Sequence, residues 1–197
     1  MKEDKREYII RKAMELYALK GYQNSTITDL QNALDIGRGT LYYYFKDQED
    51  LFYTCMERYF LEPKQKAIRS IPENAGIDDV IKAMLTYVDE IEQSLLTFTN
   101  KQINTSNSNG LMLQAYNMCP AMRRKAKRLA LTELHLWRQA IYHDQRAGLI
   151  RHDIDVEQVS LMFTYIKSSF DAGLADTQMD FSLIRKSYSE FHKLLKI

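Results

Sequence analysis

The sequence predicts an all-α protein of about nine helices, on three observations. Apolar residues recur at intervals of three and four along most of the chain, the spacing that gives a helix one apolar face. Glycine and proline are scarce, at 7 and 3 of 197 residues, which argues against a β-sandwich or a long linker. No pair of segments has the pattern of a β-hairpin. With 45% hydrophobic residues, the chain is large enough to bury a core.

The N-terminal segment predicts two helices with clear ends. Residues 2–20 carry the apolar stripe of an amphipathic helix, which Gly21 ends. Ser25 and Thr26 are both candidate caps of a second helix, and Asp29 has the spacing of a reciprocal cap with Thr26. We expect this second helix to reach about residue 34 and to turn four apolar residues inward, namely Ile27, Leu30, Ala33 and Leu34.

A third and a fourth helix follow after short breaks. Residues 35–37 form a turn, and the third helix runs over about 38–45. The fourth begins near Gln48 with Asp47 as its cap, and Pro63 either kinks it or ends it.

Beyond residue 71 the helical spacing returns. It predicts helices over 77–98, 111–118, 120–147, 155–176 and 180–196. Residues 104–110, rich in Asn and Ser, are expected to form a loop. Pro120 suits the first turn of the long helix, and Gly148 suits its end.

Residues 25–51 are the segment that indicates function. Two short helices joined by a three-residue turn form a helix-turn-helix, whose second helix can lie in the major groove of DNA. Arg38 can contact a guanine edge through two nitrogens, and Gly39 lets the backbone approach DNA closely. The three successive tyrosines that follow cannot all face one core, so at least one is exposed to hydrogen-bond a phosphate. Lys46 adds a cation for phosphate.

Three stretches of this segment resemble the DNA-binding region of TetR-type transcriptional regulators: 25–30 (STITDL), 39–46 (GTLYYYFK) and 49–51 (EDL). The resemblance implies a DNA-binding helix-turn-helix domain over 1–47 and a ligand-binding and dimerisation domain over 48–197. It implies a dimer, by family default a repressor, that binds a palindromic double-stranded operator and is released by a small-molecule inducer.

Matching positions imply the residues that contact DNA. They are Thr26, Thr28, Arg38, Gly39, Thr40, Tyr42, Tyr43 and Lys46. Of these, Thr26 and Thr28 match positions that either cap the helix or touch phosphate. Two positions depart from the family pattern. Tyr44 stands where a histidine is common, and Gln48 stands where a lysine is frequent, so one charge is lost and Lys46 carries more of the attraction to phosphate.

The last two predicted helices indicate a homodimer. The helix over 155–176 has two apolar faces, and a one-sided surface helix does not need the second. One face is Val156, Val159, Phe163, Ile166 and Phe170, and the other is Leu161, Met162, Tyr165, Ser169 and Ala172. The alternative is that both faces are core; we favour pairing of the last two helices with a second subunit.

The resemblance also implies an inducer cavity in the larger domain. Its candidate lining residues are Met84, Phe98, Met112, Tyr116, Trp137 and Phe163. Methionine and aromatic side chains suit an apolar pocket, although the same spacing is typical of an ordinary core. We expect no cofactor and no metal site, because His135 and His143 are too far apart for one ion.

The charge balance and the lack of long apolar stretches limit the DNA surface and the location of the protein. Lys and Arg number 27 and Asp and Glu 26, so a DNA surface must be a local patch. The basic run 123–128 spreads around its helix and is better explained as solvated surface. The charged start of the chain lacks the apolar stretch of a signal peptide, and no apolar run is long enough to span a membrane, so we expect a cytoplasmic protein.

Two other classes of function stay open. An enzyme would need a nucleophile with its base, a carboxylate pair or a metal cluster, and none has diagnostic spacing, so no enzymatic activity is expected. A helical interaction protein that has lost DNA binding would form a dimer that ignores DNA. Cys55 and Cys119 are expected to be buried thiols, with redox sensing as the alternative.

Overall fold

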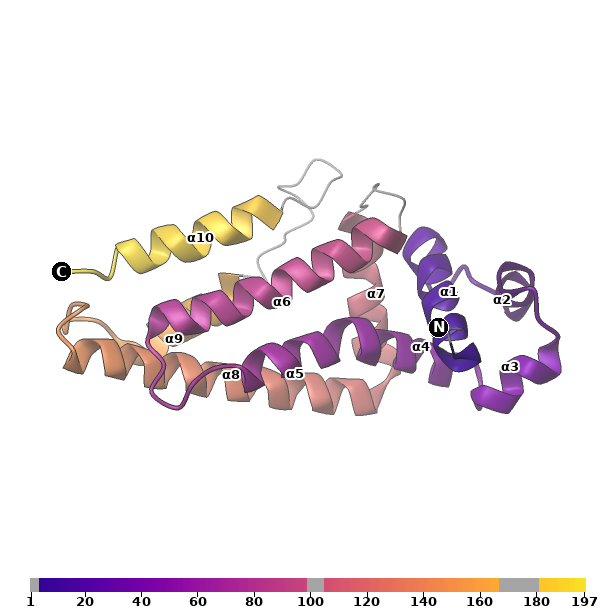
Figure 1. Ribbon diagram of the computed structural model, residues 1–197, viewed down its shortest axis with the longest axis horizontal. Helices are drawn as coiled ribbons and strands as arrows, with labels where there is room; N and C mark the ends of the chain where they lie inside the picture. Colours follow the sequence, from indigo (N-terminus) through magenta and orange to yellow (C-terminus); the bar gives the residue numbers. More distant parts are fainter. Residues whose placement is uncertain (1–3, 99–104, 167–180) are drawn as a thin grey trace. The chain divides into compact units, whose positions relative to one another are not determined.

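The computed structural model describes residues 4–98, 105–166 and 181–197, which are mainly helical (Figure 1). The helices are α1 (Lys5–Lys20), α2 (Ile27–Leu34), α3 (Arg38–Tyr44), α4 (Gln48–Met56), the π-helical turn η1 (Glu57–Leu61), α5 (Glu62–Arg69), α6 (Ile77–Phe98), α7 (Thr105–Met118), α8 (Pro120–Arg146), α9 (Val156–Ile166) and α10 (Phe181–Lys193). Because α4, η1 and α5 are continuous, nine separate helices result over the described ranges. The predicted all-α fold of about nine helices is confirmed. Within the same ranges, no helix is both long and apolar enough to cross a bilayer.

The chain divides into two compact units, each made from two stretches of sequence. The first unit is residues 1–62 with 93–125, and the second is residues 63–92 with 126–197. Helix α4 stays with the first unit because it packs on α1, and α7 joins that unit through its contacts with α1 and α4. These compact units do not coincide with the domains predicted over 1–47 and 48–197, whose functional roles stay a prediction.

Helix α1 is the centre of the first unit, packed against α2, α4 and α7. Its buried face consists of Ile9, Ile10, Ala13, Met14, Tyr17 and Ala18. Two aromatic contacts hold α4 beside α1 and the turn that follows it. The ring of Phe52 lies 5.3 Å from that of Tyr17, edge to face, and 4.2 Å from that of Tyr22, stacked. Each fully buried ring of this size stabilises the fold by about 1.5–3 kcal/mol.

The predicted inward face of α2 is correct at three of its four positions. Leu30 and Leu34 are buried and Ile27 is half-buried, but Ala33 is exposed. Helix α2 packs mainly against α1, which covers only a narrow strip of a helix of eight residues. A small apolar side chain at the margin of that strip stays in solvent.

Pro63 does not end the helix that begins at Gln48. The chain passes from α4 through η1 into α5, and Pro63 is the second residue of α5. Proline lacks the backbone N–H that would donate to the carbonyl one turn earlier, and its ring clashes with that carbonyl. The wider π-helical turn lies directly before it, a known way to accommodate such an interruption.

The prediction of a loop over 104–110 is wrong for residues 105–110, where α7 is already helical. The Asn and Ser residues of this stretch, which are weak helix formers, had suggested a loop. Leu111 and Ala115 are buried, and α7 packs against α1 and α4, so tertiary contacts outweigh local propensity. Residue 104 lies outside the described ranges.

Stacked aromatic rings form the core of the second unit. Trp137 on α8 stacks on Phe163 of α9 at 4.4 Å between ring centroids, and Tyr188 of α10 lies 5.8 Å from Trp137. All three side chains have no exposed surface. Beside them, the fully buried Glu133 accepts a hydrogen bond from Trp137 Nε1 and forms an ion pair with Lys64. Three helices are therefore joined by one dense cluster.

The start of α6 is held by a carboxylate from α8. Asp144, which is buried, accepts a hydrogen bond from the backbone N–H of Ile77 at 3.0 Å, and His143 Nδ1 lies 2.9 Å from its other oxygen. Asp144 comes so near the backbone that a Cβ placed on Gly76 would lie 2.5 Å from Asp144 Oδ1. A side chain at position 76 would therefore force Asp144 to shift away from its hydrogen bonds.

Gly76→Ala is expected to destabilise the second unit by about 1–3 kcal/mol, the usual cost of forcing an added carbon into a packed site. Urea unfolding would measure the loss. Gly110→Ala is the matched control, since nothing lies within 4 Å of a Cβ at that helical position. It is expected to leave stability unchanged or slightly raised, because alanine favours helix over glycine. Equal behaviour of the two variants would contradict the steric explanation.

Candidate nucleic-acid interface

A three-residue turn joins α2 to α3, as the sequence predicts. Asp35 ends α2 in the left-handed region, with φ of +50°. Gly37 precedes the first residue of α3 in an extended conformation. Leu41 and Phe45 are each only 2% exposed and anchor α3 to the first unit. The opposite side of α3 is left facing solvent.

The residues predicted to contact DNA all lie at the surface. Thr40 is half-exposed, and the exposed residues are Thr26, Thr28, Arg38, Gly39, Tyr42, Tyr43 and Lys46. Tyr42 is 41% exposed and Tyr43 81%, which is unusual for rings that could have joined a core. Burial of Arg38, Thr40 and Tyr42 would have excluded a role for this edge in groove binding. Their exposure is compatible with it.

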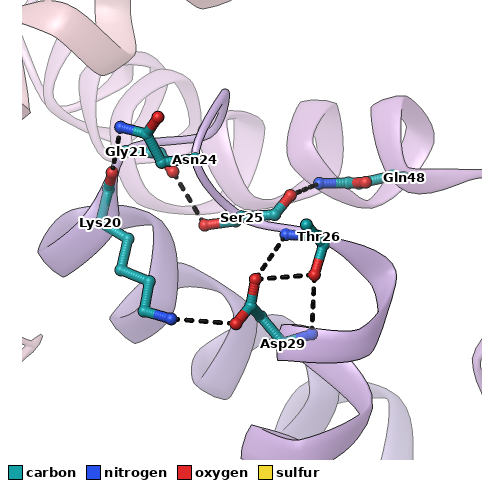
Figure 2. Close-up of polar contacts among 7 residues, drawn as sticks. All are labelled: Lys20, Gly21, Asn24, Ser25, Thr26, Asp29 and Gln48. Atoms are coloured by element: carbon teal, nitrogen blue, oxygen red, sulfur yellow. Dashed lines mark hydrogen bonds and ion pairs between the residues drawn. The ribbon is translucent and has the colours of Figure 1, made fainter.

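A reciprocal cap fixes the start of α2 (Figure 2). Thr26 Oγ1 accepts a hydrogen bond from the backbone N–H of Asp29 at 3.1 Å, and Asp29 Oδ2 accepts from the backbone N–H of Thr26 at 2.9 Å. The Thr26 hydroxyl also donates to Asp29, and Lys20 pairs with that carboxylate at 2.9 Å. The bonds from Thr26, and then Lys20, hold the pKa of Asp29 below its usual range, so the cap persists as pH falls through the ordinary carboxyl range. Thr26 is thus committed to the helix end.

Thr26→Ala is expected to lower the free energy of unfolding by about 1 kcal/mol, because the helix end then exposes an unsatisfied N–H. Thermal or urea unfolding at neutral pH would measure it. Thr26→Ser keeps the hydroxyl and is expected to remain close to wild type. A serine variant as unstable as the alanine variant would show that the cap is not the cause.

Gln48 has an internal role that the sequence did not suggest. Its side-chain amide donates to the backbone carbonyl of Ser25 at 2.5 Å, linking the start of α4 to the chain just before α2 (Figure 2). Ser25 is buried and its hydroxyl donates to the carbonyl of Gly21 at the end of α1. At this position, where a lysine is frequent in the resembling family, glutamine therefore ties the start of α4 to the start of α2, and the Ser25 hydroxyl ties the latter to the end of α1. A bond between residues 23 apart leaves no signal in local spacing.

Four acidic residues near this edge are occupied by backbone donors at helix ends. Residues 1–50 contain eight Lys and Arg but nine Asp and Glu, so no excess positive charge marks the segment. Three of the acids are helix caps: Asp4, Asp29 and Asp47. Asp50 accepts a hydrogen bond from the backbone N–H of Lys46 at 3.0 Å. These carboxylates face backbone donors, which weakens their repulsion of a phosphate.

Two aromatic contacts order the exposed side chains of α3. The guanidinium carbon of Arg38 lies 5.7 Å from the ring centroid of Tyr42. Tyr43 and Tyr44 meet edge to face at 4.9 Å. The edge is therefore a set of partly ordered side chains, one cationic and three phenolic.

A hollow of about 460 Å³ lies beside the turn. It is lined by Gln31, Asn32, Asp35, Ile36 and Gly37. The two amide side chains were not singled out from the sequence, since isolated Gln and Asn residues in a short helix carry no distinctive signal. They extend the polar surface beyond the predicted residues.

The predicted inducer-pocket residues fall into both compact units. Phe98, Met112 and Tyr116 belong to the first unit, and Met84, Trp137 and Phe163 to the second. Phe98 packs edge to face on Tyr59 at 4.7 Å, while Trp137 and Phe163 stack on each other. Met112 and Tyr116 are half-buried. Pocket lining by these residues stays a prediction.

Two members of the basic run, and both cysteines, have local contacts in the first unit. The Arg123 guanidinium donates to the carbonyls of Tyr116 and Asn117 at the end of α7, and Lys125 pairs with Glu57 at 2.5 Å. Both cysteines are buried, and burial raises the pKa of each thiol. Over the described ranges, no group of three His, Cys, Asp or Glu side chains could hold a metal ion.

Comparison with known proteins assigns this segment. Residues 9–54 match the family described as bacterial regulatory proteins, tetR family. This N-terminal segment therefore matches the TetR family. The match spans α1 to α4, so it includes the complete helix-turn-helix.

Individual relatives and solved structures are also similar to this chain. The negative transcriptional regulator IcaR of the biofilm operon icaADBC in Staphylococcus epidermidis is 23% identical over 88 residues, 45% of this chain and 48% of that protein. The chain thus spans about half of the length of this relative. A putative TetR-family regulator from Rhodococcus has a TM-score of 0.69 at 16% identity, covering 97% of this chain and 98% of that one. SmeT, the repressor of the Stenotrophomonas maltophilia multidrug efflux pump SmeDEF, has 0.66 at 14%, covering 99% and 92%. These structures share the all-helical fold of the chain over nearly its whole length.

Proposed function

We propose that this chain is a cytoplasmic, ligand-responsive repressor that binds a palindromic operator as a homodimer. The observation that carries the proposal is the outward edge of α3, where Arg38 and two tyrosines face solvent while Leu41 and Phe45 anchor the helix. The helix-turn-helix match and the repressor role stated for SmeT and IcaR support it. No enzymatic role is proposed.

In this proposal, α3 enters the major groove, and some of the side chains on and beside it contact bases while others contact phosphates. Arg38 donates to a guanine through two nitrogens, which supplies sequence preference. The Tyr42 hydroxyl and Lys46 contact phosphates, which supplies affinity for any sequence. Gly39 allows the backbone to approach the groove. The hydroxyls of Thr28 and Thr40 add phosphate or base contacts at the margin.

The second subunit is proposed to cover exposed apolar side chains on α9 and α10. On α9, Val159 and Phe163 are buried, whereas Met162 is 51% and Tyr165 is 58% exposed. Leu183 on the adjoining α10 is 57% exposed. Covering both helices with the same pair from another copy gives a two-fold dimer. Phe170 of the first predicted apolar face, and Ser169 and Ala172 of the second, lie outside the described ranges.

A dimer also provides the geometry that operator binding needs. Two recognition helices must reach half-sites about 34–36 Å apart on one face of DNA. A small molecule that binds the larger helical region and changes this separation would release the operator. The predicted lining residues, from Met84 to Phe163, are the first candidates for that site.

Binding of the purified protein to DNA from its own promoter region tests the proposal. We expect a sequence-selective complex with nanomolar to micromolar affinity whose affinity falls steeply with salt, since bound phosphates release counterions. Analytical ultracentrifugation of the complex should give two chains per operator. A dimer with no salt-sensitive, selective DNA binding would contradict the proposal and favour a helical interaction protein. Turnover of a substrate panel would instead favour an enzyme.

A further inference from the structure

Arg38 and Tyr42 contact each other across one turn of α3. Arg38 is the first residue of this helix, and its guanidinium carbon lies 5.7 Å from the Tyr42 ring centroid, within the range of a cation–π interaction. Residues four apart are neighbours on a helix surface. Aromatic side chains in helices lean toward the N-terminus, so the Tyr42 ring covers the turn from which Arg38 projects.

No other interaction competes for this arginine. Among the described residues, Arg38 has neither an ion pair nor a hydrogen bond to a side chain, and it is exposed. Lysine and arginine side chains free in solvent sample many rotamers, and fixing one of them on binding has an entropic cost. The Tyr42 ring restricts Arg38 before DNA arrives. Tyr43 makes its aromatic contact with another tyrosine, Tyr44, so the two exposed rings differ in their partners.

We propose that Tyr42 is a positioning residue for base recognition, acting through its ring on Arg38. This inference rests on the proposed DNA-binding function. Two parallel hydrogen bonds to guanine require the planar guanidinium to be presented in a defined orientation. The Tyr42 ring, over which the guanidinium carbon of Arg38 lies at 5.7 Å, limits the orientations open to it. The ring of Tyr42 therefore contributes to discrimination between bases, whereas its hydroxyl contributes to affinity for every sequence.

The two roles are separable by substitution. Tyr42→Phe keeps the ring and removes the hydroxyl, while Tyr42→Leu removes both and keeps a good helix former. Tyr43→Leu is the matched control, an equal change at the neighbouring exposed tyrosine. The measured quantity is the ratio of affinities for the preferred operator and for an operator changed at the base pair that Arg38→Ala ceases to discriminate.

We expect Tyr42→Phe to lower both affinities alike and leave the ratio unchanged. Tyr42→Leu should lower the ratio by about two- to five-fold, as loss of an exposed cation–π contact predicts. Tyr43→Leu should leave the ratio unchanged. The double variant Arg38→Ala/Tyr42→Leu should have the same ratio as Arg38→Ala, because Tyr42 acts through Arg38.

A measurement on the free protein tests the contact itself. The side-chain protons of Arg38 should show an upfield ring-current shift in NMR spectra, kept in Tyr42→Phe and lost in Tyr42→Leu. Three results would each overturn the inference while the proposed function stands. They are an unchanged affinity ratio in Tyr42→Leu, a fall of the ratio in Tyr42→Phe equal to that in Tyr42→Leu, and a ratio in the double variant below that of Arg38→Ala. Absence of any complex with wild-type protein would instead contradict the proposed function, and this inference with it.

Discussion

Lys64→Met is expected to lower the stability of the second unit by about 3–5 kcal/mol, the usual cost of removing one partner from a buried ion pair. The Lys64 ammonium lies 2.8 Å from Glu133, and their side chains are 14% and 0% exposed. Glu133 is packed against the Trp137 cluster, where water cannot replace the lost cation. The carboxylate must then remain charged in a poorly solvated site or take up a proton. Urea unfolding at neutral pH measures the loss.

Two further variants isolate the cause. Lys66→Met removes a cation that pairs with Glu90 at 2.6 Å but is 75% exposed, so it is expected to cost less than about 1 kcal/mol. Lys64→Met/Glu133→Gln removes both charges and should recover most of the stability lost in Lys64→Met. If Lys64→Met behaves like Lys66→Met, the buried pair contributes little and the aromatic cluster alone holds these helices.

Helix ends were predictable from the sequence because their chemistry is local. Gly21, with φ of +78°, ends α1, and Gly148, with φ of +69°, follows the end of α8. Asp47 caps α4, and Thr26 with Asp29 forms the predicted reciprocal cap. Each of these features depends on residues within one helical turn of each other, so spacing alone identifies it.

Features that depend on distant residues could not be predicted in this way. The Gln48 bond to Ser25 joins residues 23 apart, and the Lys64 pair with Glu133 joins two helices far apart in sequence. The same holds for the early start of α7, where packing on α1 and α4 outweighs weak propensity. Only the folded arrangement reveals which polar groups meet.

The candidate interface was predictable in part, since some of its features depend on local spacing and others on how the chain folds. Three consecutive tyrosines guaranteed that one ring would face solvent, and Tyr43 does so at 81% exposure. The spacing of four between Arg38 and Tyr42 on the predicted helix allows their contact, but only the folded structure shows that the two side chains meet. The neighbouring hollow lined by Gln31 and Asn32 depends on how the turn folds, which spacing does not give.

Arg38→Ala and Lys46→Ala are expected to weaken operator binding in different ways. Arg38→Ala should cost about 1–3 kcal/mol on the preferred operator and much less on other sequences, because a base contact is lost. Lys46→Ala should weaken binding to all sequences alike and reduce the slope of affinity against salt by about 1, because a phosphate contact is lost. Titrations of both operators at several salt concentrations measure both quantities.

Arg124→Ala provides the matched control, since Arg124 is an exposed cation of the basic run on α8. If that run is solvated surface, the substitution leaves affinity, base preference and salt slope unchanged. A reduced salt slope in Arg124→Ala would instead place α8 against phosphates. If Arg38→Ala and Lys46→Ala have identical effects on every sequence, Arg38 contacts the backbone of DNA. Base preference would then have to come from another side chain of α3 or from Gln31 and Asn32 beside the turn.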